Sequence, residues 1–533
     1  MPIALPLPPG HFRRRYAITL TILLIGVFGA YELAQYVIAN DVVGLAYIAL
    51  SLVGATVVVT VLNSWRKGFY LFLGWLLFED FARKFLGNNM IIFFAKDFLL
   101  LTVLISFFAA FRRKEVQIFS PPFRLPLLIL VWFGFMQIFN PGSTSIWYGI
   151  MGFKMFFYYV PLILVGYSLL TSESDLRRFF TVNLVLAVVI ISLGIMQSIL
   201  GASFLNPVVP AEDLRALSTL YRQSASGAIA YRPNGIFVSA GRYANFVMVA
   251  WMFVLGFSGY LLLRHKQGRV LAFIALPITA AGAFLTTSRG SFMWGIINAV
   301  ATSIAFVWGA PWKQGEARRV FRSIQRVILG AGVGMVVLFY AYPDALMSRL
   351  AIYEETLSPS SPSSELAHRG WTYPVGNFLY AFTYDRWPYG YGIGTASLGT
   401  QYVTRIFSVK PPGVGVESGF GTLVVEMGIV GLILWIVMSG AILVSAWKVV
   451  KGLKGSPCFP VGFVIFWYSF LLLLPSTFAG MAAYEDFLLN AYFWLLLGVL
   501  FRLPSIALSA QSATDATARG SRRPTATCRS SMQ

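Results

Sequence analysis

Residues 429–447 read IVGLILWIVMSGAILVSAW and contain no charged residue. A run of this kind has about the length that an α-helix needs to cross the hydrocarbon core of a bilayer, roughly 20 residues. The same character extends along the chain of 533 residues, in which apolar residues make up 57% and charged residues 12%. Soluble domains carry about 25% charged residues. The sequence therefore predicts an all-α polytopic integral membrane protein.

The apolar runs also exclude a transmembrane β-barrel. Barrel strands are about ten residues long and alternate between apolar and polar positions, whereas these runs are long and continuous. They predict about 14 transmembrane helices. The runs lie near residues 16–38, 42–62, 69–86, 91–110, 123–139, 146–170, 178–200, 235–263, 270–287, 290–309, 327–342, 418–447, 460–480 and 486–502.

Lysine and arginine between the runs indicate how the chain crosses the membrane. If the N-terminus lies in the cytoplasm, the intervening outer turns are nearly free of lysine. The cytoplasmic loops then hold Arg66 and Lys67, Arg112 to Lys114, Arg177 and Arg178, Arg264 to Arg269, Lys313 to Arg326, and Lys448 to Lys454. This agrees with the positive-inside rule. We therefore expect both termini to be cytoplasmic.

This topology divides the chain into five predicted parts. They are a cytoplasmic N-terminus at 1–15, helices one to eleven at 16–342 with an outer loop at 201–234, a large periplasmic loop at 343–417, helices twelve to fourteen at 418–502, and a disordered cytoplasmic tail at 503–533. Loops as long as the periplasmic one are usually functional. Because it is rich in aromatic residues, glycine and proline, we expect it to pack as a cap over a site.

The sequence lacks the patterns of several other functional classes. The net charge of +20 is explained largely by cytoplasmic loops that orient the helices, not by nucleic-acid binding. The two cysteines, Cys458 and Cys528, and the three histidines give no metal-ligand pattern. Walker A and dinucleotide-binding loops do not occur. We expect no metal, no cofactor, no nucleic-acid partner and no ATP-driven pump.

Arginine is frequent in the predicted outer regions, against the general rule. The cations expected there are Arg215, Arg222, Arg232, Arg242, Arg289, Arg349, Arg369, Arg386, Arg405 and Lys410. A guanidinium offers a planar fork of donors that fits phosphate and carboxylate. The set therefore favours an anionic ligand, such as a lipid-linked diphosphate. The alternative is that these arginines snorkel to the interface or pair with acidic residues of the loops.

Three of these positions stand out. Arg289 lies between two apolar runs, where the amides of the following helix and the guanidinium are expected to face one phosphate. Arg232 precedes a proline at the end of the first long loop, in a turn before the next helix. Arg242 lies about two turns inside that helix, and a cation at such a depth usually marks a site or pathway. Glu426 lies inside an apolar run and is expected to balance a buried cation.

Four short stretches carry a resemblance to a known family. They read RPNGIF at 232–237 with Asn245 further on, LTTSRG at 285–290, RGW at 369–371 with PYGYGIG at 388–394, and ESGFGTLVVEMGIVG at 417–431. In this order, and with all four on the predicted outer face, the sequence resembles the O-antigen ligase and Wzy-type polymerase superfamily of bacterial membrane glycosyltransferases.

The resemblance implies a GT-C-like fold in a bacterial inner membrane. It also implies transfer of a glycan from undecaprenyl diphosphate to an acceptor hydroxyl on the periplasmic face, without a metal. Arg232 and Arg289 then bind the donor diphosphate, and we place Arg242 with them. Further substrate contacts are expected in the large loop, from Arg369, Trp371, Arg386 and Tyr391.

The predicted general base departs from the family pattern. Ligases usually carry a histidine at the start of the fourth stretch, where this chain has Glu417. A carboxylate can deprotonate an acceptor hydroxyl, so Glu417 is the predicted base and His368 the backup. The absence of the histidine favours an exopolysaccharide or O-antigen polymerase over an O-antigen ligase or a protein O-oligosaccharyltransferase.

Two other classes stay open. A flippase or exporter predicts charges along a path to the cytoplasm and discontinuous helices near the midplane, whereas this sequence concentrates arginine at one face. A non-catalytic scaffold would make the outer arginines incidental. The expected partners are an undecaprenyl-diphosphate-linked oligosaccharide, a glycan acceptor, the lipid bilayer and other polysaccharide assembly proteins.

Overall fold

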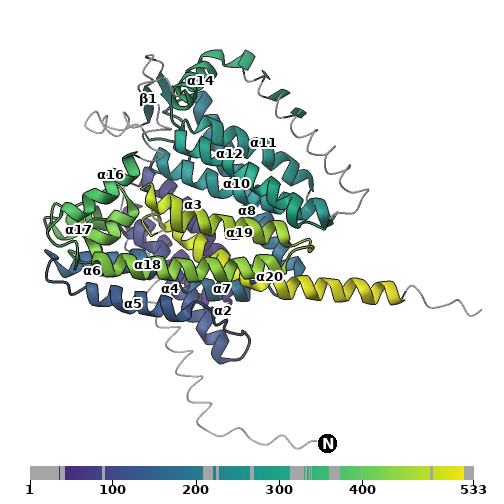
Figure 1. Ribbon diagram of the computed structural model, residues 1–533, viewed down its shortest axis with the longest axis horizontal. Helices are drawn as coiled ribbons and strands as arrows, with labels where there is room; N and C mark the ends of the chain where they lie inside the picture. Colours follow the sequence, from purple (N-terminus) through teal and green to yellow (C-terminus); the bar gives the residue numbers. More distant parts are fainter. Residues whose placement is uncertain are drawn as a thin grey trace, which may run out of the picture. The chain divides into compact units, whose positions relative to one another are not determined.

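The computed structural model is mostly helical (Figure 1). It describes residues 35, 42–86, 90–207, 220–223, 227, 229–264, 269–311, 329–330, 333–334, 336–337, 339–358, 372–397, 399–480 and 484–520. Within these residues the β-structure is one antiparallel hairpin, β1 (Tyr221–Gln223) with β2 (Ile229–Tyr231).

The helices lie on both sides of the hairpin in the sequence. Before it come α2 (Val42–Asn63), α3 (Trp65–Phe85), α4 (Met90–Arg112), α5 (Arg124–Gln137), α6 (Ile146–Phe157), α7 (Leu162–Leu169) and α8 (Glu173–Leu200). After it come α10 (Ala240–Arg264), α11 (Arg269–Leu285), α12 (Arg289–Gly309), α14 (Pro343–Leu357), α16 (Tyr373–Tyr380), η3 (Ala381–Thr383), α17 (Gly399–Phe407), α18 (Gly419–Gly452), α19 (Phe459–Leu471), η4 (Leu472–Ser476) and α20 (Phe487–Gly520).

Eight helical segments of the described chain are long and apolar enough to cross a membrane. They are Met90–Arg112, Ile146–Leu169, Glu173–Leu200, Ala240–Leu263, Arg289–Gly309, Gly419–Gly452, Phe459–Ser476 and Phe487–Ser509. Their exposed faces are apolar: on α12, Ile296, Val300, Ile304 and Val307 are all exposed and recur at helical spacing. Such a stripe is suited to contact with lipid. The prediction of an all-α membrane protein is confirmed at this level.

The chain forms two compact units. The first comprises residues 1–74 and 95–112, and its described part consists of α2 with parts of α3 and α4. In it, the buried Trp65 and Phe107 pack edge to face with ring centroids 5.2 Å apart. The second unit, residues 75–94 and 113–533, contains every residue of the site described below.

Small residues let two helices of the second unit approach closely. Helix α20 packs along α7, and a Cβ at Gly166 would lie 2.1 Å from the Leu495 carbonyl oxygen. The converse holds at Gly498, where a Cβ would lie 2.1 Å from the Ile163 carbonyl oxygen. Glycines at matching positions allow backbone contact, which is a common way for helices to associate in lipid.

One end of the second unit carries the β-hairpin, and we call it the hairpin end. Thr287, between α11 and α12, donates a hydrogen bond to the Tyr231 carbonyl of β2 over 3.2 Å. Helix α10 begins here too, and Asn245 near its start donates to Asp486, just before α20, over 3.1 Å. The consecutive helices α10, α11 and α12 and the distant helix α20 therefore present termini at the hairpin end.

The opposite end of the second unit collects basic residues. Gly455, after α18, donates to the Gly309 carbonyl at the end of α12 over 2.8 Å. Tyr260, near the end of α10, donates to Glu173 at the start of α8 over 2.5 Å. The helix termini and turns of this end carry Arg177, Arg178, Lys448, Lys451 and Lys454. Arg502, inside α20, reaches the same end and donates to the Leu170 carbonyl over 2.9 Å.

Helix α18 is interrupted by the chain segment 388–394. At Gly428, φ is 72° and ψ is −177°, so the helix is broken there. The Tyr391 N–H donates to the Val425 carbonyl over 2.8 Å, and the next amide donates to the next carbonyl over 2.9 Å. Carbonyls freed by a break inside a membrane helix need partners. The PYGYGIG segment supplies them.

Replacing Gly390 by alanine is expected to destabilise the second unit strongly. Gly390 has a φ of 79°, and a Cβ there would lie 2.4 Å from the Glu426 carbonyl oxygen. Gly413 is a matched control, because its φ is 73° but its Cβ would meet open space. The backbone strain alone costs about 1–2 kcal/mol, and the clash should bring Gly390→Ala to about 3 kcal/mol or more. Thermal unfolding in detergent measures both variants, and equal shifts would contradict the role given to Gly390.

One sequence-based expectation needs correction, and one predicted span stays untested. The disordered tail was predicted from residue 503, but α20 continues to Gly520. Residues 503–520 are rich in alanine, a strong helix former, so the helix extends beyond its apolar part. The run at 69–86 forms α3, but this helix is not among the membrane-crossing candidates because it contains Glu79, Asp80, Arg83 and Lys84.

The predicted large loop is partly helical. Residues 343–417 contain α14, α16 and α17, so the loop is not an open tether in its described parts. The run at 16–38 lies outside the described residues apart from Gln35, and the run at 327–342 is described only in part.

Candidate functional site

A cavity of about 510 Å³ opens among the helix termini of the hairpin end. Its walls come from the hairpin, the first half of α10, the start of α12, α16, α19 with η4, and α20. Three arginines line it: Arg222, Arg232 and Arg289. The sequence-based prediction placed Arg232 and Arg289 at one site, and the structure brings them to one cavity.

The hairpin and the following turn hold Arg232. Its N–H donates to the Leu220 carbonyl over 2.6 Å, which extends the pairing of β1 and β2 by one residue. The next turn is fixed from α8, because the Gln197 side-chain oxygen accepts the N–H groups of Asn234 and Gly235 over 3.0 and 2.7 Å. The backbone on both sides of Arg232 is therefore rigidly placed.

Arg232 is available to a ligand. Its Nε is buried and has no hydrogen-bond partner in the described part of the chain. Burial lowers the pKa of the Arg232 guanidinium, and the nearby Tyr353 opposes this effect. An arginine nevertheless stays charged. A half-buried cation with an unused, buried Nε donor favours an anionic ligand that replaces water around it.

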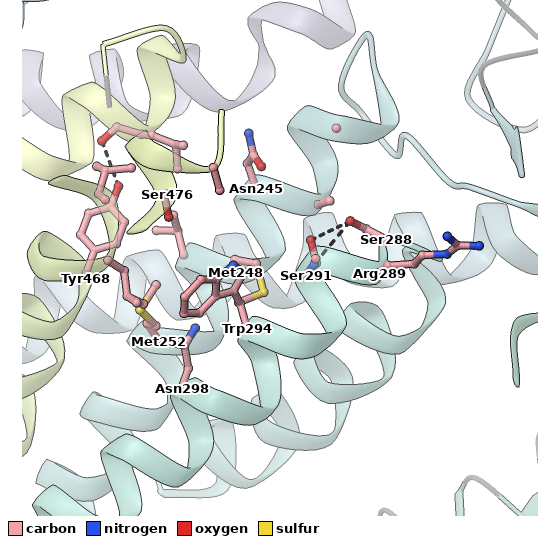
Figure 2. Close-up of a pocket in the computed structure, with 18 of the residues that line it drawn as sticks. Asn245, Met248, Met252, Ser288, Arg289, Ser291, Trp294, Asn298, Tyr468 and Ser476 are labelled. Atoms are coloured by element: carbon pink, nitrogen blue, oxygen red, sulfur yellow. Dashed lines mark hydrogen bonds between the residues drawn. The ribbon is translucent and has the colours of Figure 1, made fainter. Parts of the chain in front are cut away.

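Arg289 is placed by the cap of α12. Ser288 is the N-cap, and its hydroxyl oxygen accepts the Ser291 N–H over 3.4 Å. Arg289 is then the first helical residue and is 9% exposed. Figure 2 shows Ser288 and Arg289 on one side of the cavity, with the Arg289 side chain directed away from Trp294. The first amides of a helix also favour an anion at this position.

Away from the arginines, the cavity is apolar. Met248 and Met252 of α10 and Trp294 of α12 form this lobe (Figure 2). Asn298 lines the lobe nine residues after Arg289, which is about 13 Å along the helix axis. Its side-chain oxygen accepts the Trp467 indole N–H over 2.9 Å. The cavity therefore has a cationic part, lined by arginines, and a mainly apolar extension along the helices.

Glu417 lies beside the cavity, joined to it by a tyrosine. Its carboxylate accepts a hydrogen bond from the Tyr373 hydroxyl, and Tyr373 lines the cavity. The neighbouring Ser418 donates to the Phe478 carbonyl over 3.1 Å, next to the cavity residue Ala479. Glu417 itself is exposed and is not part of the wall. Sequence reasoning did not select Tyr373, although it follows the RGW stretch by two residues.

Arg242 is held away from the cavity by an ion pair. Its guanidinium contacts both carboxylate oxygens of Asp80, at 2.8 and 2.9 Å, and lies 4.6 Å from the centroid of the Phe487 ring. Asp80 is buried and also contacts Arg83 at 3.3 Å. The expectation that Arg242 joins the diphosphate-binding arginines is not supported by this placement, because a buried carboxylate already occupies the guanidinium.

Two predicted loop residues lie outside the cavity wall. The Arg386 guanidinium lies against Gly142, where an added Cβ would be 2.9 Å from it. The Tyr391 ring packs against Tyr384 with centroids 6.2 Å apart, and its amide completes the broken helix α18. His368, Arg369 and Trp371 lie outside the described residues.

Glu426 was expected to pair with a buried cation, but in the structure its carboxylate accepts hydrogen bonds from backbone amides. It is fully buried, and one carboxylate oxygen accepts the Ala396 and Ser397 N–H groups over 3.0 and 2.7 Å. Glu426 therefore anchors the loop that follows the PYGYGIG segment. The sequence could not show this, because the amides are about 30 residues away.

The arrangement offers three chemical capabilities. The guanidiniums can bind a phosphate or diphosphate, the apolar lobe can hold a hydrocarbon chain, and the Tyr373–Glu417 pair can accept a proton. In the described residues no group of His, Cys, Asp and Glu is arranged to hold a metal ion. No protein-family model matches the chain, and no curated protein is significantly similar to it.

Proposed function

We propose that the chain is a membrane glycosyltransferase that polymerises glycan repeat units carried on a polyprenyl diphosphate such as undecaprenyl diphosphate. The observation that carries the proposal is the cavity that Arg222, Arg232 and Arg289 line together with a mainly apolar lobe. A lipid diphosphate combines these two features in one molecule. A free phosphate would not need the lobe, and a lipid without phosphate would not need the arginines.

The proposed reaction needs no nucleotide and no resident cofactor. The acceptor hydroxyl oxygen attacks the anomeric carbon of the donor sugar, and the bond from that carbon to the diphosphate oxygen breaks. Negative charge then grows on the leaving diphosphate, where fixed guanidiniums stabilise it. The acceptor proton passes to the Tyr373–Glu417 pair, directly or through the tyrosine hydroxyl.

The placement in the membrane is part of the same proposal. The opposite end of the second unit carries the lysines Lys448, Lys451 and Lys454 beside its arginines, whereas the cations that line the cavity of the hairpin end are all arginines. In this proposal the lysine-bearing end therefore faces the cytoplasm, by the positive-inside rule. The hairpin end and its cavity then face the periplasm of a bacterial inner membrane. The count of about 14 spanning helices, the GT-C-like fold and the two cytoplasmic termini belong to this proposal as well.

The test is the state of the glycan in a strain that lacks the gene and carries either wild type or Arg232→Ala. Membrane protein levels are matched first. We expect long polymer with wild type and single lipid-linked repeat units, displayed on the periplasmic side, with Arg232→Ala. Long polymer that stays on its lipid carrier would instead indicate a ligase. Repeat units retained on the cytoplasmic side would indicate a flippase. Normal polymer with Arg232→Ala would show that Arg232 is not needed at the site.

A further inference from the structure

Arg349 is a fully buried arginine that does not line the cavity described above. It lies on α14, inside the predicted periplasmic loop, and is 1% exposed. Its Nε donates to the Thr287 hydroxyl oxygen over 3.2 Å, and its Nη2 donates to the Tyr231 carbonyl over 3.1 Å. Tyr231 directly precedes Arg232, and Thr287 lies two residues before Arg289. One guanidinium therefore joins the two turns that carry the cavity arginines.

Thr287 closes this connection. Its hydroxyl accepts from Arg349 and donates to the same Tyr231 carbonyl over 3.2 Å. Its backbone carbonyl accepts from Arg222 over 3.5 Å. Thr287 also has a φ of 53°, which is rare for a β-branched residue and persists only where the surroundings hold it. The contacts with Arg349, Tyr231 and Arg222 are what hold it here.

Helix α14 is itself fixed against the same turn. The Tyr353 hydroxyl donates to the Phe284 carbonyl over 2.6 Å. The Tyr353 ring stacks on Phe292 of α12 with centroids 4.3 Å apart. Arg349 thus comes from a helix that is anchored to both sides of the Thr287 turn, and its guanidinium is preorganised to reach across to the hairpin.

We propose that Arg349 is a positioning residue that sets the separation of Arg232 and Arg289, so that both can engage one diphosphate. The inference rests on the proposed function, because it takes a lipid diphosphate as the ligand. Arg349 does not line the cavity and acts on the two cavity arginines through its hydrogen bonds to Tyr231 and Thr287. A planar guanidinium suits this role because it reaches two acceptors in a fixed geometry, which a lysine ammonium does not.

The test uses the full-length protein in detergent and farnesyl diphosphate as the probe, with binding measured by calorimetry and farnesol as the uncharged control. We expect Arg349→Met to weaken binding about tenfold and Arg349→Lys to restore little of it. Thr287→Val should weaken binding by a smaller factor, whereas Thr287→Ser keeps the hydroxyl and should bind as wild type. The exposed Glu354 of the same helix gives the control Glu354→Gln, which should have no effect.

The double variant separates positioning from general damage. If Arg349 and Thr287 act as one connection, Arg349→Met with Thr287→Val binds no more weakly than Arg349→Met alone. Wild-type affinity in Arg349→Met, or effects that multiply in the double variant, would overturn the proposal. If Arg349→Met does not accumulate in the membrane, the comparison of Thr287→Val with Thr287→Ser decides the proposal. Equal affinities of these two variants overturn the proposal, and a loss of affinity only in Thr287→Val supports it.

Failure of this inference can be told from failure of the proposed function. If Arg232→Ala binds farnesyl diphosphate as tightly as wild type, the diphosphate site is absent and both proposals fall. If Arg232→Ala loses binding but Arg349→Met keeps it, the site stands and only the role of Arg349 is wrong. If Arg232→Ala and Arg349→Met both lose binding but the wild-type protein transfers no glycan, the positioning role of Arg349 stands and the proposed polymerase activity is wrong.

Discussion

Arg289→Ala is expected to lower the rate of glycan transfer about a hundred- to a thousandfold, the range found when one fixed donor to a developing negative charge is removed. Arg289 is nearly buried at the first position of α12, so water cannot readily replace the lost guanidinium. The measurement is the turnover of a purified lipid-linked repeat unit by protein reconstituted in vesicles.

The choice of substitutions at Arg289 identifies what the residue supplies. Arg289→Lys keeps the positive charge but loses the planar set of donors of the guanidinium, so its turnover should lie between those of Arg289→Ala and wild type. Arg113→Ala is the matched control, because Arg113 is 57% exposed and, among the described residues, pairs with the similarly exposed Glu115. Turnover in Arg289→Ala within about twofold of wild type would exclude a role for this guanidinium in the chemical step.

Glu417→Gln is expected to reduce turnover about a hundred- to ten-thousandfold, as the loss of a general base does. Glutamine keeps the size of the side chain and an oxygen that can accept from Tyr373, so binding of the donor should change little. The predicted signature is a fall in kcat with KM nearly constant. Stopped assays over a range of acceptor concentrations provide both values.

Two further variants test the route by which the proton of the acceptor hydroxyl reaches Glu417. Tyr373→Phe removes the hydroxyl between the cavity and Glu417, so it should reduce kcat in the same direction. Glu354→Gln alters an exposed carboxylate on α14 and should leave kcat unchanged. An unaltered kcat in Glu417→Gln would remove the residue as the base and return attention to His368.

The sequence predicted which residues meet at the site where this depends only on how the chain crosses the membrane. Arg232 and Arg289 both lie next to the ends of apolar runs, and runs that cross the membrane in turn bring alternate ends to one side. Their meeting in one cavity follows from that alternation. The same argument covers Glu417, just before α18.

Side-chain partners that are distant in sequence could not be predicted. Arg242 pairs with Asp80, 162 residues away, and the sequence gives no sign of which charges inside the runs face each other. Glu426 resembles an unpaired buried acid until the Ala396 and Ser397 amides are placed beside it. Tyr373 was one aromatic residue among many, and only its hydrogen bond to Glu417 distinguishes it.

The segment that completes α18 is made before the helix that needs it. Residues 388–394 leave the ribosome ahead of Gly428, so the donors are already present when the broken helix enters the membrane. A chain truncated between residue 394 and Val425 contains the segment 388–394 but lacks the carbonyl groups of α18 that this segment binds. Topology maps built from truncated reporter fusions should therefore mislead in this region, and labelling of single cysteines in the intact chain is the sounder method.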